Sequence, residues 1–111
     1  METIIQSPHF IIGEKLKAFA ETKAAKLLKY DDRIVKCEMI LKLNKADDDK
    51  NKICEISIYR QQSQLFAYAQ CLTFEDAINE TIRSIEKQLK KNTAKMRKTA
   101  ERHTKINMEA D

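Results

Sequence analysis

Residues 83–105 concentrate positive charge in a way that suits binding to a polyanion. This segment holds nine basic residues and two acidic ones, whereas the net charge of the whole chain is only +4. The basic residues are therefore segregated rather than diluted along the chain. Such a helix needs a polyanionic partner or extensive hydration, and nucleic acid is the leading candidate. The nine basic residues are Arg83, Lys87, Lys90, Lys91, Lys95, Arg97, Lys98, Arg102 and Lys105.

A second group of basic residues lies along the first predicted helix. At about 100° per residue, four of them project within about 60° of one another: Lys15, Lys26, Lys29 and Arg33. Lys23 lies closer to the apolar stripe and can extend its amine from it. Two helices side by side on a sheet would present two lysine rows, which can follow phosphates without recognising bases. The alternative is that both rows are simply solvated helix faces.

Tyr30, at the end of the first predicted helix, is the aromatic residue nearest to these rows. Its ring could stack on an exposed RNA base. A partly buried tyrosine that closes the edge of the core is an equally good interpretation, and the sequence leaves both open.

No constellation of residues indicates an enzyme, a metal site or a cofactor. Gly13 is the only glycine, which excludes glycine-rich phosphate loops and nucleophile elbows. The three cysteines lack a C-x-x-C pair, and His9 and His103 stand far apart. We therefore expect a binding protein without a small-molecule substrate. No apolar run approaches the roughly 20 residues of a membrane helix, so a cytoplasmic protein without membrane contact is the simplest expectation.

Hydrophobic periodicity predicts four strands and two helices. In order these are a strand at 2–7, a helix at 14–30, strands at 34–43, 53–60 and 65–72, and a helix that starts at Thr73, its predicted cap, and ends near Lys98. The polar segment 44–52 is a predicted hairpin loop. Alternation places the apolar residues of the last three strands on one face: Val35, Cys37, Met39, Leu41 and Leu43, then Cys54, Ile56 and Ile58, then Leu65, Ala67, Ala69 and Cys71.

This element order predicts an α+β fold, a two-layer β-α-β-β-β-α sandwich. The first two strands enclose a helix and should be parallel, whereas the hairpins that follow should be antiparallel. Both helices carry a single apolar stripe, so both are expected on one face of the four-stranded sheet. We expect one domain over residues 1–98 and a flexible tail over residues 99–111.

Two segments resemble a known family. Residues 16–34, LKAFAETKAAKLLKYDDRI, are similar to the first helix of the ribosome hibernation-promoting factors, which include ribosome-associated inhibitor A and were once called sigma-54 modulation proteins. Residues 66–91 resemble the family's last strand and second helix, and the similarity covers about residues 2–98. The matches in the first helix are Phe19, Lys23, Ala25, Lys26, Leu27, Tyr30, Asp32, Arg33 and Ile34; those near the second are Ala77, Ile78, Gln88, Leu89 and Lys91.

The chain also departs from the family pattern. Thr73, Phe74 and Glu75 replace a usual Asp-Met-Tyr, and Asn79 replaces a frequent aspartate. Asp31 stands where the family often has an aromatic residue, and Gly13 stands at a usual Thr or Ser cap. The basic rows are unaffected by these differences.

The resemblance implies a fold similar to the double-stranded RNA-binding domain and a specific function. Family members bind the small ribosomal subunit between head and body near the decoding centre, block tRNA and mRNA binding, and inhibit translation in stationary phase or stress. The chain ends before the dimerisation domain of long members, so we expect a short form that is monomeric off the ribosome. The basic rows and the resemblance together suggest these rRNA-binding residues: Lys23, Lys26, Lys29, Tyr30, Arg33, Lys87, Lys90, Lys91 and Lys95.

Two other functions remain open at this stage. One is a regulatory protein-interaction module whose outer sheet face binds a partner through Ile40, Ile53, Tyr59, Phe66 and Tyr68. The other is a double-stranded RNA binder that acts off the ribosome.

Overall fold

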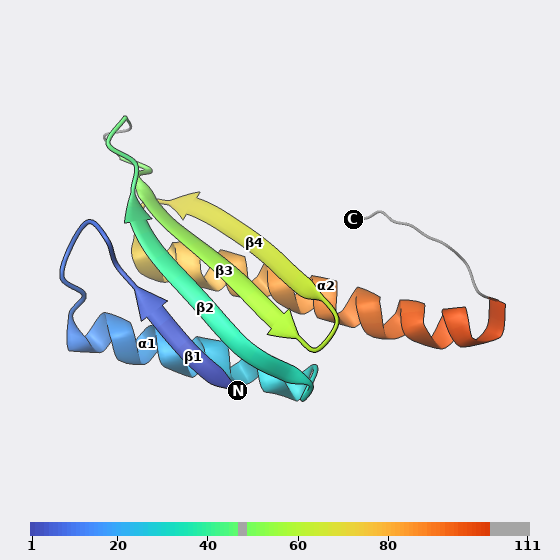
Figure 1. Cartoon of the computed structure of the whole chain (residues 1–111). Helices are drawn as coiled ribbons and strands as arrows, with labels where there is room; N and C mark the ends of the chain where they lie inside the picture. Colours follow the sequence, from blue (N-terminus) through green and yellow to red (C-terminus); the bar gives the residue numbers. More distant parts are fainter. Residues whose placement is uncertain (47–48, 103–111) are drawn as a thin grey trace.

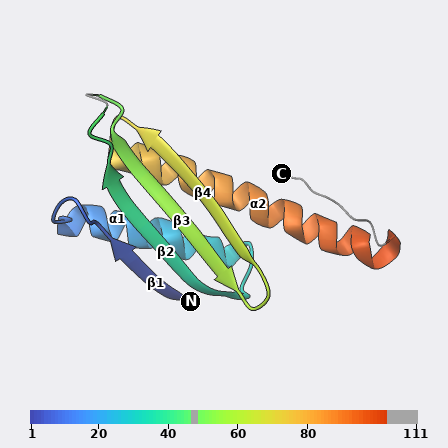
Figure 2. The same ribbon diagram turned by 45° about the horizontal axis from the view of Figure 1, so that its top comes forward.

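The computed structural model describes residues 1–46 and 49–102, with side chains as far as Lys91. Its elements are β1 (Glu2–Gln6), α1 (Glu14–Ala25), the 3-10 helix η1 (Lys26–Lys29), β2 (Ile34–Leu43), β3 (Lys52–Arg60), β4 (Gln64–Cys71) and α2 (Phe74–Arg102). The strands form one sheet in the order β1-β2-β3-β4. β1 is parallel to β2, and the other pairs are antiparallel. Both helices cover the same face of the sheet (Figures 1 and 2), which confirms the predicted α+β sandwich.

The helix starts follow from local chemistry. The backbone of Gly13 is extended, and its carbonyl accepts a hydrogen bond from the Lys17 N–H at 3.0 Å. Thr73 caps α2 as predicted, since its Oγ1 accepts a hydrogen bond from the Asp76 N–H at 3.1 Å. Glu75 and Asp76 lie in the first turn, where carboxylates interact favourably with the helix dipole.

The sequence predicted an α-helix as far as Tyr30, but the α-helix ends at Ala25. It becomes the 3-10 helix η1 at Lys26. A 3-10 helix advances about 120° per residue instead of about 100°. Side chains three apart in a 3-10 helix point to the same side, so Lys26 and Lys29 still share one direction, whereas Arg33 lies beyond η1, just before β2.

The core lies between the sheet and the two helices. Cys37, Cys54 and Cys71 are buried and unpaired, as predicted from the alternation of their strands. Thr81 is also buried; its hydroxyl lies 2.7 Å from the Ala77 carbonyl oxygen and 3.2 Å from that of Cys54. This contact connects α2 to the centre of the sheet. The other fully buried large side chains are Leu27, Met39, Leu41, Ile56, Ile58, Ile78, Ile85 and Leu89.

Val35 is an exception to the predicted strand pattern. It was expected to face the core, but 56% of it is exposed, whereas Ile34 is only 4% exposed. The pairing of β2 with β3 shifts register between Ile34 and Lys36. A β-bulge of this kind inserts one residue and reverses the facing of the side chains before it.

α2 extends well beyond the sheet (Figure 1). Leu89 is the last buried residue among the α2 side chains that the structure describes, and the helix continues to Arg102, past the predicted end near Lys98. Residues 103–111 of the predicted tail lie outside the described part of the chain. Within the described residues, no helix combines the length and hydropathy that a membrane crossing requires.

Candidate nucleic-acid interface

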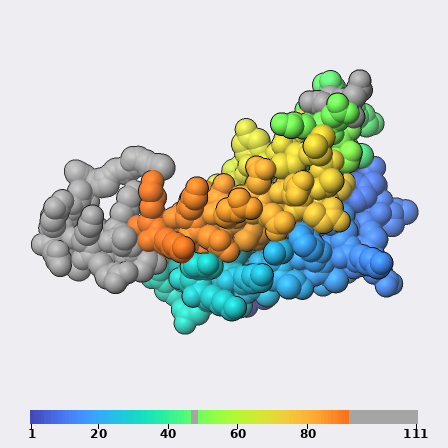
Figure 3. Space-filling model, turned by 180° about the vertical axis from the view of Figure 1, so that it is seen from behind, coloured from blue at the N-terminus to red at the C-terminus, as the bar shows by residue number. Residues whose placement is uncertain are grey.

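The two helices lie side by side and form the outer surface of one layer (Figure 3). A hollow between them, here called the interhelix hollow, is lined by Lys23, Lys26, Asn79, Ile82, Arg83 and Glu86. Three of these side chains are cationic and one is anionic. The sequence placed Arg83 in the basic row of the second helix but not among the candidate binding residues. Its position one turn before Lys87 was the signal that could have identified it.

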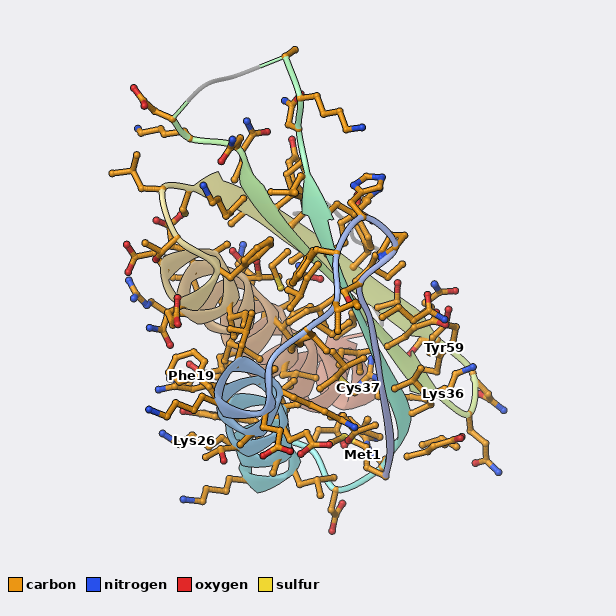
Figure 4. The ribbon with its side chains drawn as sticks, turned by 90° about the vertical axis from the view of Figure 1, so that its left-hand side faces the viewer. Met1, Phe19, Lys26, Lys36, Cys37 and Tyr59 are labelled. Carbon is orange, nitrogen blue, oxygen red and sulfur yellow. The ribbon has the colours of Figure 1, made fainter. Side chains whose placement is uncertain are left out.

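Lys23 and Lys26 belong to the α1 side of this hollow. Lys23 is partly buried, and its Nζ lies 5.4 Å from the ring centroid of Phe19. The amine thus lies beside an apolar ring, which agrees with the predicted position of Lys23 near the apolar stripe. Lys26 is exposed and extends from the helical layer away from the sheet (Figure 4). Lys29 is also exposed, in the last turn of η1.

Tyr30 connects the two helices at the end of η1. The Nζ of Lys90, from α2, lies 5.2 Å from the centroid of the tyrosine ring. Tyr30 is 37% exposed, so its ring supports the ammonium group at the surface rather than in the core. A cation held over an aromatic face keeps its charge and loses part of its mobility. Sequence reasoning named both residues but did not predict their contact.

The remaining α2 candidates lie along the same helix. Lys87, Lys90 and Lys91 lie within little more than one turn, and all three are exposed. Of these, Lys90 lies close to the Tyr30 ring. Lys95 is in the described helix, but its side chain is outside the described part. The helical layer therefore presents cations from both α1 and α2.

Arg33 occupies a different environment from the lysines. Its Nε donates to Asp31 Oδ1 at 2.9 Å, and its Nη2 donates to Asp31 Oδ2 at 3.1 Å. The side chain of Arg33 is 51% exposed, whereas that of Asp31 is only 2% exposed. Arg60, from the end of β3, donates from Nη1 to Asp31 Oδ2 at 2.6 Å. One buried carboxylate thus holds two guanidinium groups.

The environment of Asp31 stabilises its charged form. Hydrogen bonds from Arg33 and Arg60 hold the pKa of this carboxyl far below its usual range, although burial opposes the shift. From the sequence, Asp31 was noted as a departure from the family pattern. The Asp-x-Arg spacing could have suggested the pair with Arg33, but the contact with Arg60 depends on the pairing of β2 with β3.

The outer face of the sheet has a different character. Phe66 and Tyr68 are exposed with ring centroids 6.3 Å apart, and Lys36 and Tyr59 lie on the side opposite to Lys26 (Figure 4). Charged groups on this face contact one another or neighbouring rings. Lys42 pairs with Glu55 at 3.0 Å, the Tyr59 hydroxyl donates to Glu38 Oε1 at 3.1 Å, and the Lys36 Nζ lies 4.5 Å from the Tyr59 ring centroid. The helices up to Lys91 carry more basic than acidic residues, whereas these basic and acidic groups of the sheet face are equal in number.

Among the described residues, no group of three or more His, Cys, Asp or Glu side chains is placed to hold a metal ion. The arrangement supports the binding of an anionic surface by fixed cations rather than a reaction.

Comparisons with known proteins place these features in context. A family model described as "Sigma 54 modulation protein / S30EA ribosomal protein" matches residues 3–97. The fold is similar to that of a ribosomal subunit interface protein from Coxiella burnetii, with a TM-score of 0.76, 21% identity, and coverage of 85% of this chain and 99% of that one. It is also similar to the N-terminal domain of Protein Y from Thermus thermophilus, with a TM-score of 0.71, 18% identity, and coverage of 82% and 98%. No curated protein sequence matches this chain.

Proposed function

The chain belongs to the sigma 54 modulation protein / S30EA ribosomal protein family of ribosome-associated binding proteins, which are not enzymes, and from this premise we propose that it is a cytoplasmic ribosome hibernation factor. It binds the rRNA of the small ribosomal subunit near the decoding centre. There it blocks the binding of tRNA and mRNA and inhibits translation in stationary phase or stress. Off the ribosome it is a monomer.

The difference in charge between the two faces carries this proposal. The helical layer supplies Lys23, Lys26 and Arg83 in the interhelix hollow, and Lys87, Lys90 and Lys91 along α2. Cations arranged in rows contact successive phosphates and displace the counterions of RNA. Such contacts position a protein on folded RNA without recognition of bases. A rigid domain held in this way inhibits by occupying the space that other ligands of the subunit require.

A specific observation favours a second candidate function. Phe66 and Tyr68 are 49% and 65% exposed on the sheet face, and exposed aromatic side chains are common at protein interfaces. In this alternative the domain regulates a partner protein through the sheet. Duplex RNA binding off the ribosome is the third candidate, and it would use the helical face.

Sedimentation with purified small ribosomal subunits tests the proposal. We expect the protein to sediment with the subunits at low salt and to dissociate as the salt concentration rises, with a linear decrease of log K against log salt. Excess duplex RNA should compete only weakly. Binding that is insensitive to salt would favour the protein-interaction alternative, and equal competition by duplex RNA would favour the third candidate.

A further inference from the structure

A second hollow lies where the segment after η1, the start of β2 and the β3–β4 turn meet. It is lined by Arg33, Val35, Arg60, Gln61, Gln62 and Ser63. None of these lining residues is acidic, and the amide and hydroxyl groups of 61–63 can donate hydrogen bonds. We name it the Arg33 hollow. In the chain, its Arg33 follows η1, which carries Lys26 and Lys29.

The Asp31 carboxylate controls the orientation of the arginine in this hollow. It accepts hydrogen bonds from the Nε and Nη2 of Arg33 and, at 2.9 Å, from the Arg33 backbone N–H. Side-on pairing engages one edge of the guanidinium group and directs the opposite edge away from Asp31. A half-exposed arginine would otherwise sample many rotamers. Here the backbone N–H and the guanidinium group of Arg33 both donate hydrogen bonds to the buried Asp31 carboxylate.

Arg60 fixes the carboxylate in turn. Its Nη1 donates to Asp31 Oδ2, its Nε donates to Ser63 Oγ at 2.9 Å, and its backbone N–H donates to the Ser63 carbonyl at 2.9 Å. The side chain of Arg60 is only 11% exposed. Because these bonds join the end of η1 to the β3–β4 turn, the geometry of the Arg33 hollow is set before any ligand arrives.

We propose that the Arg33 hollow is a phosphate-binding subsite for the RNA backbone and that Asp31 is the positioning residue that holds Arg33 in it. The inference rests on the proposed function for the identity of the RNA. In this proposal, Asp31 and the β3–β4 turn take part in RNA binding although both lie outside the two helices. A planar guanidinium group presented in a fixed direction matches the geometry of phosphate oxygens.

Removal of the Asp31 charge distinguishes a positioning role of Asp31 from an effect of net charge alone. Loss of a negative charge near an RNA-binding surface should strengthen binding if only net charge matters. If Asp31 positions Arg33, Asp31→Asn should instead weaken binding to purified small subunits by roughly tenfold. The slope of log K against log salt should become shallower by about one unit, as for one lost phosphate contact. The matched control is Asp32→Asn, an exposed neighbour with the same change of charge, which should bind at least as tightly as the wild type.

Arg33→Lys provides a second variant that keeps the positive charge. Lysine cannot pair side-on with both Asp31 oxygens. Since Arg33 is half-exposed, the variant should fold and should bind as weakly as Asp31→Asn. Combination of the two substitutions should cause no further loss. Independent, additive losses would mean that Asp31 acts only on stability, and wild-type affinity in Asp31→Asn or Arg33→Lys would overturn the proposal.

Titration with inorganic pyrophosphate tests the subsite without the ribosome. In the wild-type protein, the Arg33 Nε–H resonance and the backbone amide resonances of residues 61–63 should shift with added pyrophosphate. In the Arg33→Lys variant, the shifts of the 61–63 amides should be smaller. If the wild-type chain fails to bind subunits but shows these shifts, the proposed function fails while the subsite stands. Absence of a shift in the wild-type protein contradicts the subsite even if subunits bind.

Discussion

The Nζ of Lys90 lies 5.2 Å from the centroid of the Tyr30 ring, and this contact joins the end of η1 to the middle of α2. The two residues are distant in sequence, and each was a separate candidate for RNA binding. Their contact makes the ring a support that places one ammonium group of α2 beside the cations of η1. The two basic rows are therefore mechanically connected at this point.

The Tyr30–Lys90 contact should contribute to binding through the aromatic ring. Tyr30→Leu should weaken subunit binding several-fold, because an exposed cation–π contact contributes about 0.5–1 kcal/mol. Tyr30→Phe retains the ring and should bind as the wild type does. Dissociation constants for both variants, measured also in a Lys90→Ala background, check this. If Tyr30→Leu causes the same loss with and without Lys90, the ring acts directly on RNA and not through the lysine.

Charge reversal on the helical face should weaken binding much more than it alters stability. Lys26 and Lys91 are both exposed, and exposed substitutions typically change stability by no more than about 0.5 kcal/mol. Lys26→Glu combined with Lys91→Glu removes two phosphate contacts and adds repulsion, so the loss should exceed that of the double alanine variant. Sedimentation with ribosomes and thermal unfolding measure the two effects.

The matched control for charge reversal lies on the opposite face. Phe66→Ala combined with Tyr68→Ala should leave ribosome association intact, because both side chains are exposed on the sheet. If this variant fails to sediment with ribosomes while the glutamate variant sediments normally, the sheet is the interface. The protein-interaction function would then replace the one proposed.

The three cysteines should react slowly in the native protein. Burial raises the pKa of Cys37 to about 11 and that of Cys54 to about 12, and it also raises the pKa of Cys71. The reactive thiolate is therefore scarce at neutral pH and the sulfur atoms are inaccessible. Labelling with a maleimide should be slow without denaturant and fast in guanidinium chloride. Rapid labelling of all three in the native protein would contradict the strand register.

Acid should remove the stabilisation that the Asp31 network provides. The folded-state pKa of Asp31 is depressed, so the unfolded state binds more protons as the pH falls below the ordinary value of about 3.9. The contribution is fully present at neutral pH and is lost as the pH falls toward the folded-state pKa. Asp31→Asn should cost roughly 3 kcal/mol at pH 7, since it leaves the mostly buried Arg60 without its carboxylate.

Urea unfolding of the wild type and of Asp31→Asn at pH values of about 7, 4 and 2.5 measures this dependence. The difference in unfolding free energy between the two proteins should narrow as the pH falls. Asp32→Asn serves as the control and should change stability little at neutral pH. A constant difference over the whole range would mean that the charge of Asp31 does not provide the stabilisation.

Local patterns in the sequence determined the elements and the core. Alternation along 34–43 predicted β2 with its observed bounds and placed Cys37, Met39 and Leu41 inside. The same two-residue alternation correctly placed Cys54 and Cys71 in the core. Thr73 was recognisable from the sequence as the cap of α2. These features depend on side-chain facing over a few residues, so they can be inferred without knowledge of distant partners. The segregation of basic charge is likewise a property of the residue order alone.

The tertiary structure decided where those elements bring distant side chains together. The bulge that exposes Val35 arises from the pairing of β2 with β3, and the Asp31–Arg60 bond depends on that same pairing. The contact of Tyr30 with Lys90 depends on how η1 meets α2. No local period encodes these distances, because they depend on the positions of separate backbone segments after the core has packed. The sequence by itself thus determined which residues are cationic and exposed, whereas packing determined which of them act together.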